Sequence, residues 1–587
     1  MNVFTRHAAL ISSPPPRHSR ERGMALLTAI IFISLALMIL AVLSNRYFQQ
    51  QLLVNQFQIY HTAFDGLEAV FEEARVAFDN GDLDGIGLDD WTPEYANGRL
   101  VLPDWDDNDV SPHTLSTNPE VEFIAYIDHW GSNGEDSNGD GTVDSGAEQG
   151  VYSFHLMSRF DGVTRQAEVV VRSMDVNIWQ NAIFGGVGQS GALINGNVKI
   201  HGSVHLLGEA LLEGATAINV MELSGTAMMH NSYHGMPSGL RSRVPALPTV
   251  DIDGVSSETL NAVLRVRQGL VSMSGNAHIG LSQNSVPSGY KGPVDGTYVT
   301  DGWTGNSVTA DGNRGVPSNV NSDNGWDNLY DLGNLLNFPV LNDPWRDVNG
   351  SEVVNPDTGE MYSHDDYFTQ ILVGNQPNVP DHGIFEGDLT IHARNSPSFY
   401  WNATTQEQLT GSDADNATPG VDDDYIRFDA NSKVLEANGQ IRINGDLTFE
   451  GQGSSKTIHY SGRAAFLVDG DITVATNLRS CNNGNPTNTA NSFPENNVLG
   501  FMATQNIELG DSSQLEIMGA FYAQDTVLMD KQTDVVGALV ASYFDMGNQV
   551  PSIYHVPTLH QFLPYGMIGN HPILIMEQIT WREIGID

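Results

Sequence analysis

Oxygen-bearing side chains recur at every second position from residue 136 to residue 144, and this spacing suits a divalent cation. The segment reads DSNGDGTVD, and Gly141 provides the sharp turn that such a loop needs. It matches the first nine positions of a twelve-residue calcium-binding loop. Position twelve is Ala147, so the last ligand must come from a shifted loop or from elsewhere, and a solvated acidic turn is the alternative. The expected calcium ligands are Asp136, Asn138, Asp140, Thr142, Asp144 and Glu148.

Other reactive side chains have less specific patterns. A GxGxxG sequence begins at Gly186, but the sequence after it resembles a strand and not the helix whose N-terminus would bind a pyrophosphate. His201 and His205 are four residues apart, as are the histidines at 230 and 234, yet no carboxylate lies near them to complete a metal site. Cys481 has only Arg479 as a basic neighbour, which favours an unreactive thiol. No catalytic residue can be selected from the sequence.

Composition limits the compartment and the partners. The chain has 27 Lys and Arg against 71 Asp and Glu, a formal net charge of -44, which argues against binding to nucleic acid. Its single cysteine excludes an intramolecular disulfide. The 59 glycines and 26 prolines favour many turns and short strands. With 587 residues, the chain is long enough for three or four domains or for one long repetitive domain.

An uncharged apolar segment follows a basic N-terminus. Residues 1–23 contain four arginines opposed by Glu21, and residues 24–43 are long enough to cross a bilayer. Basic residues before the segment predict that the N-terminus is cytoplasmic and that the bulk of the chain lies outside the membrane. A signal anchor or a cleaved secretory signal is the alternative, although residues 41–44 form a poor cleavage site.

The junction RERG-MALLTAIIF resembles the class III leader of type IV pilins, which a prepilin peptidase cuts after the glycine before the new N-terminus is methylated. The resemblance implies cleavage between Gly23 and Met24. Major pilins have glutamate at the fifth mature position, where this chain has Thr28. This departure resembles PilX-type minor pilins and the K-type minor pseudopilin of type II secretion, which lie at or near a filament tip.

Apolar residues spaced by four and three continue from Leu53 to Phe78 and predict that the helix extends beyond the membrane. An unbroken helix from Met24 to Phe78 would be roughly 80 Å long. This is the stem pattern of pilins, and a coiled-coil dimer stalk is the alternative. The residues expected to serve the stem and assembly are Thr28, Leu53, Phe57, Tyr60, Phe64, Leu67 and Phe71.

A small sheet is predicted after the helix. Strands are expected at 99–102, 121–130, 152–160 and 163–172, and Asp161-Gly162 is a strong hairpin signal between the last two. The segment VTRQAEVVVR with the hairpin before it resembles the small C-terminal sheet of PilX-type proteins. Residues 24 to about 180 therefore resemble a complete minor pilin.

A short repeat occupies the rest of the chain. Gly followed by Asn or Asp and an alternating apolar strand recurs as GNVKI at 196, GNAHI at 275, GDLTI at 387, GDLTF at 445 and GDITV at 470. Such strands can stack as the coils of a β-solenoid, with the Gly and Asn/Asp at its corners, and the 25-residue step between the last two is a plausible coil. A twisted β-sandwich is the alternative.

The fold class is therefore predicted as mainly β with a long N-terminal α-helix, in which a pilin-like helix and small antiparallel sheet precede a β-solenoid-like domain. The predicted ranges are 1–23 for the leader, 24–80 for the transmembrane and amphipathic helix, 81–182 for the small β domain with the calcium loop, and 183–587 for the solenoid-like domain.

The resemblance implies a non-enzymatic minor-pilin-like component of a type IV pilus that takes part in assembly, tip structure and adhesion. Its implied partners are other minor pilins, a pilus tip adhesin, the prepilin peptidase, the inner membrane through one helix, and a surface polysaccharide. The bulk would be periplasmic and later at the pilus or cell surface. The alternative is an exported β-helix carbohydrate-active enzyme or a signal-anchored polysaccharide-binding protein.

Overall fold

The computed structural model divides the chain into two compact units. Unit 1 comprises Met1–Met174 and Met576–Asp587, and unit 2 comprises Asp175–Ile575, so unit 2 is an insertion within unit 1. The structure describes residues 19–584 except 80–85, 89–91, 97–98, 106, 108–109, 131–150, 187–193, 197, 209–217, 306–318, 326–336, 347–352, 355–358, 370–382, 404, 421–422, 454–455, 511–513, 530, 547–549 and 570–572.

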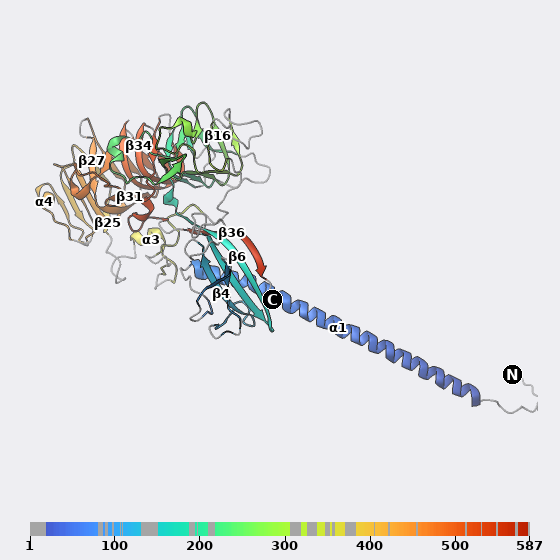
Figure 1. Cartoon of the computed structure of the whole chain (residues 1–587). Coiled ribbons are helices and arrows are strands. Elements are labelled where there is room, and N and C mark those ends of the chain that lie inside the picture. The colour runs from blue at the N-terminus through green and yellow to red at the C-terminus, as the bar shows by residue number, and fades with distance from the viewer. Residues whose placement is uncertain are drawn as a thin grey trace, which may run out of the picture. The chain divides into compact units, whose positions relative to one another are not determined.

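Unit 1 begins with a single long helix, α1 (Ser19–Asp79), whose 61 residues span roughly 90 Å (Figure 1). The sequence predicts one continuous helix that runs from Met24 through the regularly spaced apolar residues between Leu53 and Phe78, which we call the seam. This prediction is confirmed. The helix ends where the sequence changes to Gly- and Asp-rich residues, which favour turns.

The sheet of unit 1 has the order β3-β4-β5-β6-β36. Asp161 and Gly162 form the turn between β5 and β6 with positive φ angles of 47° and 77°, as the hairpin signal predicts. The strands of unit 1 are β1 (Glu94–Ala96), β2 (Arg99–Val101), β3 (His113–Thr114), β4 (Glu122–His129), β5 (Val151–Phe160), β6 (Val163–Val176) and β36 (Ile573–Ile584).

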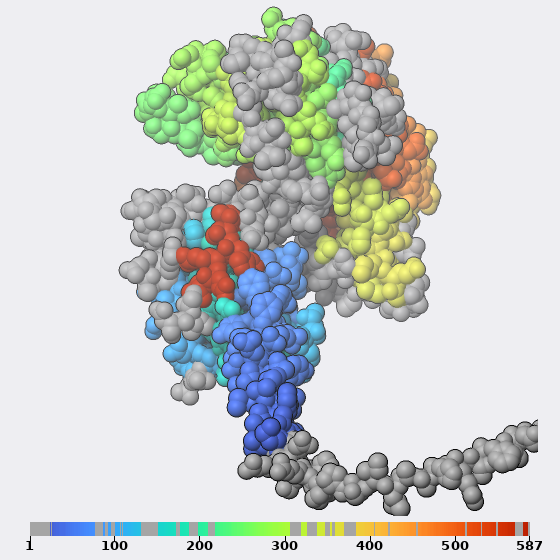
Figure 2. Space-filling model, turned by 90° about the vertical axis from the view of Figure 1, so that its right-hand side faces the viewer, coloured from blue at the N-terminus to red at the C-terminus, as the bar shows by residue number. Residues whose placement is uncertain are grey.

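The last strand, β36, corrects the predicted domain ranges. It lies beside β6 in the sheet of unit 1 although about 400 residues separate the two strands (Figures 1 and 2). The prediction that 183–587 forms one solenoid-like domain is therefore wrong for the residues after Ile575. Pairing with β6 covers a sheet edge that would otherwise expose its unpaired backbone groups.

Unit 2 is a three-sided parallel β-solenoid. In successive coils the chain passes through a first, a second and a third row of strands, and each strand pairs in parallel with the strand of the neighbouring coil. This parallel pairing confirms the solenoid prediction and excludes the antiparallel sandwich. The 25-residue step is one coil, because Leu447 of β26 aligns with Ile472 of β29.

The three rows are populated as follows. The first row holds β7 (Ile183–Gly185), β10 (Val204–Leu206), β15 (Val263–Val266), β18 (Gly296–Val299), β20 (Gly383–Glu386), β25 (Val434–Asn444), β28 (Arg463–Val468) and β31 (Val498–Ala503). The second holds β8 (Ile194–Gly196), β11 (Asn219–Leu223), β16 (Leu270–Met273), β19 (Trp303–Thr304), β21 (Leu389–His392), β26 (Leu447–Glu450), β29 (Ile472–Ala475) and β32 (Ile507–Leu509). The third holds β9 (Lys199–His201), β12 (Met228–His230), β17 (His278–Ile279), β27 (Thr457–Ser461), β30 (Asn477–Ser480) and β35 (Ser552–Tyr554).

Three long strands, β25, β33 (Leu515–Leu528) and β34 (Thr533–Asp545), bend around the corners and pair in more than one row. Outside the rows, the structure describes the hairpin β13 (Thr249–Ile252) and β14 (Val255–Glu258), and the antiparallel strands β22 (Phe399–Asn402), β23 (Gln408–Thr410) and β24 (Tyr425–Asp429). The short helices are α2 (Ser238–Arg241), α3 (His364–Thr369), α4 (Ser412–Asp415), η1 (Ile178–Gln180), η2 (Gln283–Ser285), η3 (Asn482–Gly484) and η4 (Leu559–Gln561).

The coils are not stacked in chain order. The first coil, beginning with β7, pairs with β10 on one side and with β34, from the last coil, on the other. The chain therefore winds outward from the middle of the solenoid, continues at the opposite end with β20, and winds back to the middle. Trp179 and Ile568 lie where the chain enters and leaves unit 2, and the Trp179 indole donates a hydrogen bond of 2.8 Å to the Ile568 carbonyl.

Inward side chains form ladders along the solenoid axis. Phe466, Phe501 and Phe521 align on neighbouring coils, with ring centroids 5.5 and 5.3 Å apart and nearly parallel planes. All three rings are buried. These three coils thus bury aromatic rings against one another, which stabilises this part of the stack through buried apolar area.

The repeated Gly-Asp corners connect adjacent coils through the aspartate side chain. Asp388 Oδ1 accepts from the Asp446 amide at 3.0 Å, and Asp446 Oδ1 accepts from the Asp471 amide at 2.9 Å. A Cβ on Gly470 would lie 2.0 Å from Asp446 Oδ1. Gly470 does not have a left-handed φ, so glycine is required there only because the neighbouring coil approaches so closely. At the equivalent corner, Gly387 has a φ of +91°, which favours glycine for its backbone conformation instead.

Candidate functional site

The N-terminal part of α1 exposes an almost continuous apolar surface. Every large apolar side chain described from Met24 to Phe57 is exposed, from 51% for Leu35 to 71% for Met24. Arg46 is the one Lys, Arg, Asp or Glu between Met24 and Phe64. Burying a side chain of this kind is worth roughly 1.5–3 kcal/mol. This surface therefore requires a membrane or other helices around it.

One helix in the described part of the chain, Leu26–Val76, is long and apolar enough to cross a membrane. This helix continues without a break into the part that packs on the sheet. A single rigid element thus joins the apolar segment to the folded part of unit 1.

The C-terminal third of α1 packs against the sheet of unit 1 through a stripe of small and aliphatic residues. A Cβ on Gly66 would lie 3.0 Å from Val121 Cγ1 and 3.4 Å from Ser158 Cβ, so glycine permits the close approach of helix and sheet. The Ser158 hydroxyl donates to the Ala63 carbonyl at 2.6 Å. The fully buried apolar members of the stripe are Ala63, Leu67, Val70 and Ala74.

The predicted seam divides into two parts in the structure. Leu53, Phe57 and Tyr60 are exposed, with Tyr60 under the Arg165 guanidinium at 4.7 Å. Phe64 is half-buried and Leu67 is buried. The short aromatic spacing thus serves packing on the chain's own sheet only from about residue 63 onward.

Phe71 lies where α1, β5 and β36 meet. Its ring contacts Phe154 edge-on at 5.3 Å and Trp581 edge-on at 6.0 Å. Sequence reasoning missed Trp581, although the alternating sequence ILIMEQITWREI of β36 is itself a strand signal. The predicted seam does not include the small residues Ala63 and Gly66, because it follows mostly large apolar residues.

A hollow of about 540 Å³ separates α1 from the turn of the β5–β6 hairpin. It continues the exposed apolar surface of α1 into a recess beside the sheet. The lining residues are Asn55, Phe57, Gln58, Ile59, His61, Thr62, Phe160 and Asp161.

The structure describes the predicted processing residues but not the predicted metal ligands. Gly23 and Met24 lie within α1, and the Thr28 hydroxyl donates to the Met24 carbonyl at 2.8 Å. The Thr28 side chain is thereby bound to the preceding turn of its own helix. The expected calcium ligands from Asp136 to Glu148 lie outside the described residues. Within the described residues, no group of three or more His, Cys, Asp and Glu side chains is placed to hold a metal ion.

The histidines of the third row are part of the core. His201 stacks on His230 at 4.3 Å and on Tyr554 at 4.4 Å, and its Nδ1–H donates to the Ser232 carbonyl at 2.7 Å. Burial, followed by the neighbouring His230 charge, holds the pKa of His201 well below its usual value. Burial also lowers the pKa of His230 to about 4 and raises the pKa of the Cys481 thiol to about 11. These groups are neutral and buried near pH 7, which is the structural interpretation that the sequence favours.

No family model matches the chain, and no curated protein matches it. Among solved structures, the chain is similar to the crystal structure of the competence-associated pilin ComZ from Thermus thermophilus, with 16% sequence identity and a TM-score of 0.44. The similarity covers 89% of this chain and 96% of that chain. At this level of similarity, the function has to be inferred from the residues of the chain itself.

Proposed function

We propose that this chain is a minor-pilin-like component of a type IV pilus, anchored in the inner membrane before assembly and incorporated into the filament through α1. The observation that supports this most is α1 itself: one helix is bare and apolar over its first part and packed on a small antiparallel sheet over its last part. The RERG-M junction and Thr28 add the resemblance to PilX-type minor pilins.

The proposed partners follow from the chemistry of the exposed surface. An apolar helix with one charged residue in about forty is best covered by lipid first and by the apolar helices of other minor pilins afterwards. The prepilin peptidase would cut between Gly23 and Met24. Unit 2 would be presented at the pilus tip, where it contributes to adhesion on a surface polysaccharide or through a tip adhesin.

The first test is the N-terminal peptide of the protein in filaments sheared from the native cell. An N-methylated peptide beginning at Met24 is expected in the sheared fraction. Intact residues 1–23 found in the membrane fraction alone would instead identify a signal-anchored surface protein.

A pair of variants tests whether the exposed part of α1 serves assembly and the part packed on the sheet serves folding. Phe57→Asp places a charge on the exposed part of α1, where Phe57 is 68% exposed, and we expect a folded protein that no longer enters filaments. Leu67→Asp buries an unpaired charge beneath the sheet, and we expect loss of the folded unit. Normal filament content for Phe57→Asp would contradict assembly through this surface.

The loop at 136–148 is proposed to bind calcium, which would stabilise an exported chain that has one cysteine. Titration calorimetry of the purified protein with calcium should give binding heat, and the heat should disappear in Asp136→Ala and Asp140→Ala. Unchanged binding heat in both variants would contradict a calcium site in this loop.

A further inference from the structure

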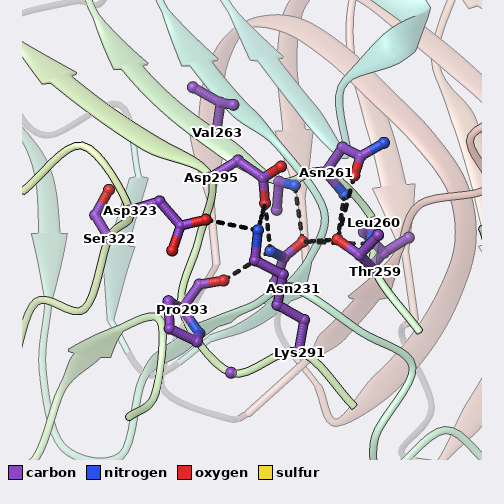
Figure 3. A network of polar contacts seen from close by, with 12 residues as sticks. Asn231, Thr259, Leu260, Asn261, Val263, Lys291, Pro293, Asp295, Ser322 and Asp323 are labelled. Atoms are coloured by element: carbon purple, nitrogen blue, oxygen red, sulfur yellow. Dashed lines mark hydrogen bonds and ion pairs between the residues drawn. The ribbon is translucent and has the colours of Figure 1, made fainter. Parts of the chain in front are cut away.

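Lys291 is a buried lysine in the loop before β18, and its ammonium group lies between two carboxylates (Figure 3). Its side chain is 11% exposed, and Nζ lies 2.9 Å from Asp295 Oδ1 and 2.7 Å from Asp323 Oδ2. Burial lowers the pKa of Lys291, but the hydrogen bonds that its ammonium donates to the Asp323 and Asp295 carboxylates outweigh burial and raise the pKa. Asp295 and Asp323 both contact the ammonium, and Asp295 also contacts the Asn231 amide.

The same Asp295 oxygen also contacts a buried amide. Asn231, which follows β12 and is 1% exposed, donates from Nδ2 to Asp295 Oδ1 at 2.6 Å and to the Pro293 carbonyl at 2.7 Å. A single carboxylate oxygen thus accepts hydrogen bonds from the Lys291 amine and from the Asn231 amide nitrogen. Figure 3 shows the two nitrogens side by side beneath Asp295.

Three donors point at the carbonyl oxygen of the Asn231 amide. Oδ1 accepts from the Ala262 amide at 2.8 Å, the Leu260 amide at 3.2 Å and the Thr259 hydroxyl at 3.2 Å. The two backbone N–H groups identify this atom as the oxygen, since they cannot donate to an NH₂ group. Donors preorganised in this way stabilise the negative charge that develops on a carbonyl oxygen when a nucleophile attacks its carbon.

We propose that Lys291 and Asn231 form an intramolecular isopeptide bond, with Asp295 transferring the protons. The Asp295 carboxylate takes a proton from the Lys291 ammonium, and the neutral amine attacks Asn231 Cγ. The oxyanion is held by Thr259, Leu260 and Ala262, and Asp295 returns its proton to Nδ2 as the Cγ–Nδ2 bond breaks. The new amide nitrogen then passes its extra proton to the departing ammonia, so that one ammonium ion leaves and no oxidant or reductant is needed.

Backbone hydrogen bonds hold the reacting groups on adjacent coils. The Lys291 amide donates to the Glu258 carbonyl at 2.9 Å, the Asp295 amide donates to the Ala262 carbonyl at 2.8 Å, and the Leu260 amide donates to the Asn231 carbonyl at 3.0 Å. Such fixed placement replaces a bimolecular encounter by an intramolecular one. The bond would covalently join the corner after β12 to the loop between β17 and β18 in a chain that cannot form an intramolecular disulfide.

Peptide mapping of the purified full chain tests the bond directly. Trypsin does not cleave after an acylated lysine, so we expect the peptide 200–241 joined to the peptide 268–314, about 17 Da lighter than the two together because one ammonia is lost. Separate, unmodified peptides 200–241 and 268–291 would overturn the proposal, whatever the behaviour of any variant.

Three variants assign the roles. Lys291→Arg keeps a cation between the carboxylates but cannot form the bond, so its peptides should be separate. Asp295→Asn should also give separate peptides, because the proton carrier is removed, whereas Asp323→Asn should keep the linked peptide. A linked peptide in Asp295→Asn, or its loss in a folded Asp323→Asn protein, would contradict the assignment of Asp295.

Discussion

At the scale of single residues, the aspartates at the corners of the solenoid do more than tolerate a turn. Asp446 accepts a hydrogen bond from the amide of Asp471 in the next coil, while its own amide donates to Asp388 in the preceding coil. Each aspartate therefore satisfies a backbone donor that the corner would otherwise leave without a protein partner. This explains why the repeated pair is Gly-Asp: the aspartate supplies the acceptor, and the glycine leaves space for it.

We expect Asp446→Ala to lower the free energy of unfolding by about 1 kcal/mol, because the Asp471 amide loses its acceptor. Asp446→Asn keeps an Oδ1 acceptor and should be nearly neutral. Urea unfolding of the full chain, followed by tryptophan fluorescence, to which the buried Trp179 contributes, measures both variants. Equal losses for Ala and Asn would show that the carboxylate charge matters instead of the hydrogen bond.

The buried histidines make the stability of unit 2 depend on pH. In the unfolded chain His201 and His230 titrate near their usual value of 6.5, whereas in the fold the pKa of His230 is about 4 and that of His201 is well below 6.5. Between these values the unfolded chain binds more protons, so stability is lost as the pH falls from about 6.5 toward 4.

We expect His230→Phe to flatten this loss, by up to about 1.4 kcal/mol for each pH unit below 6.5, because the titrating group is removed and a stacked ring is kept. Urea unfolding at pH 7 and pH 5 provides the comparison, and the exposed His113→Phe is the control. An unchanged slope in His230→Phe would contradict the assignment.

At the scale of elements, β36 joins the C-terminal segment of the chain to the N-terminal segment within the sheet of unit 1. It pairs beside β6, and its side chains form ion pairs from Arg582 to Glu168 and from Glu583 to Arg165, the latter at 2.5 Å. Partly exposed ion pairs contribute little, so most of its stabilisation should come from strand pairing and from Trp581.

Trp581→Ala should lower the free energy of unfolding of unit 1 by about 2 kcal/mol, since the indole covers the edge of Phe71 beneath the sheet. Ile579→Ala on the same strand is the matched control, because Ile579 is 49% exposed and should cost little. Hydrogen exchange at β5 and β6 reports the change. Similar exchange in both variants would show that strand pairing alone holds β36.

At the scale of the whole molecule, unit 2 is inserted into unit 1, so the points where the chain enters and leaves unit 2 have to lie close together. The solenoid achieves this by winding outward and back, so that β7 of its first coil pairs with β34 of its last. In unit 1 the connected strands β6 and β36 are themselves neighbours. Either unit can therefore form its own core from its own strands.

Replacing residues 177–572 with a short Gly-Ser linker should leave a folded unit 1, because β6 and β36 remain neighbours that a short connection can join. On the proposed function, this variant should still enter sheared filaments while surface attachment is lost. Circular dichroism and hydrogen exchange measure the fold separately from filament content. An unfolded product would show that unit 1 depends on unit 2.

Local interactions explain what the sequence determined by itself. The uncharged run from Met24, the hairpin turn at Asp161-Gly162 and the 25-residue coil were predictable because each depends on residues close together in the chain. The spacing of the seam residues predicts a helix with one apolar face. It does not predict that the sheet of unit 1 covers part of this face, because periodicity shows which face is apolar and not what packs on it.

Only the tertiary structure decided the contacts between segments that are far apart in the chain. The pairing of β7 with β34, the return of β36 to β6, and the meeting of Lys291 with Asn231 each bring distant segments together. The corners built from Gly and Asp or Asn look alike wherever they recur, so the repeat predicts that coils stack but not which coils are neighbours. That order depends on the packing of complete coils against one another, which no short stretch of sequence contains.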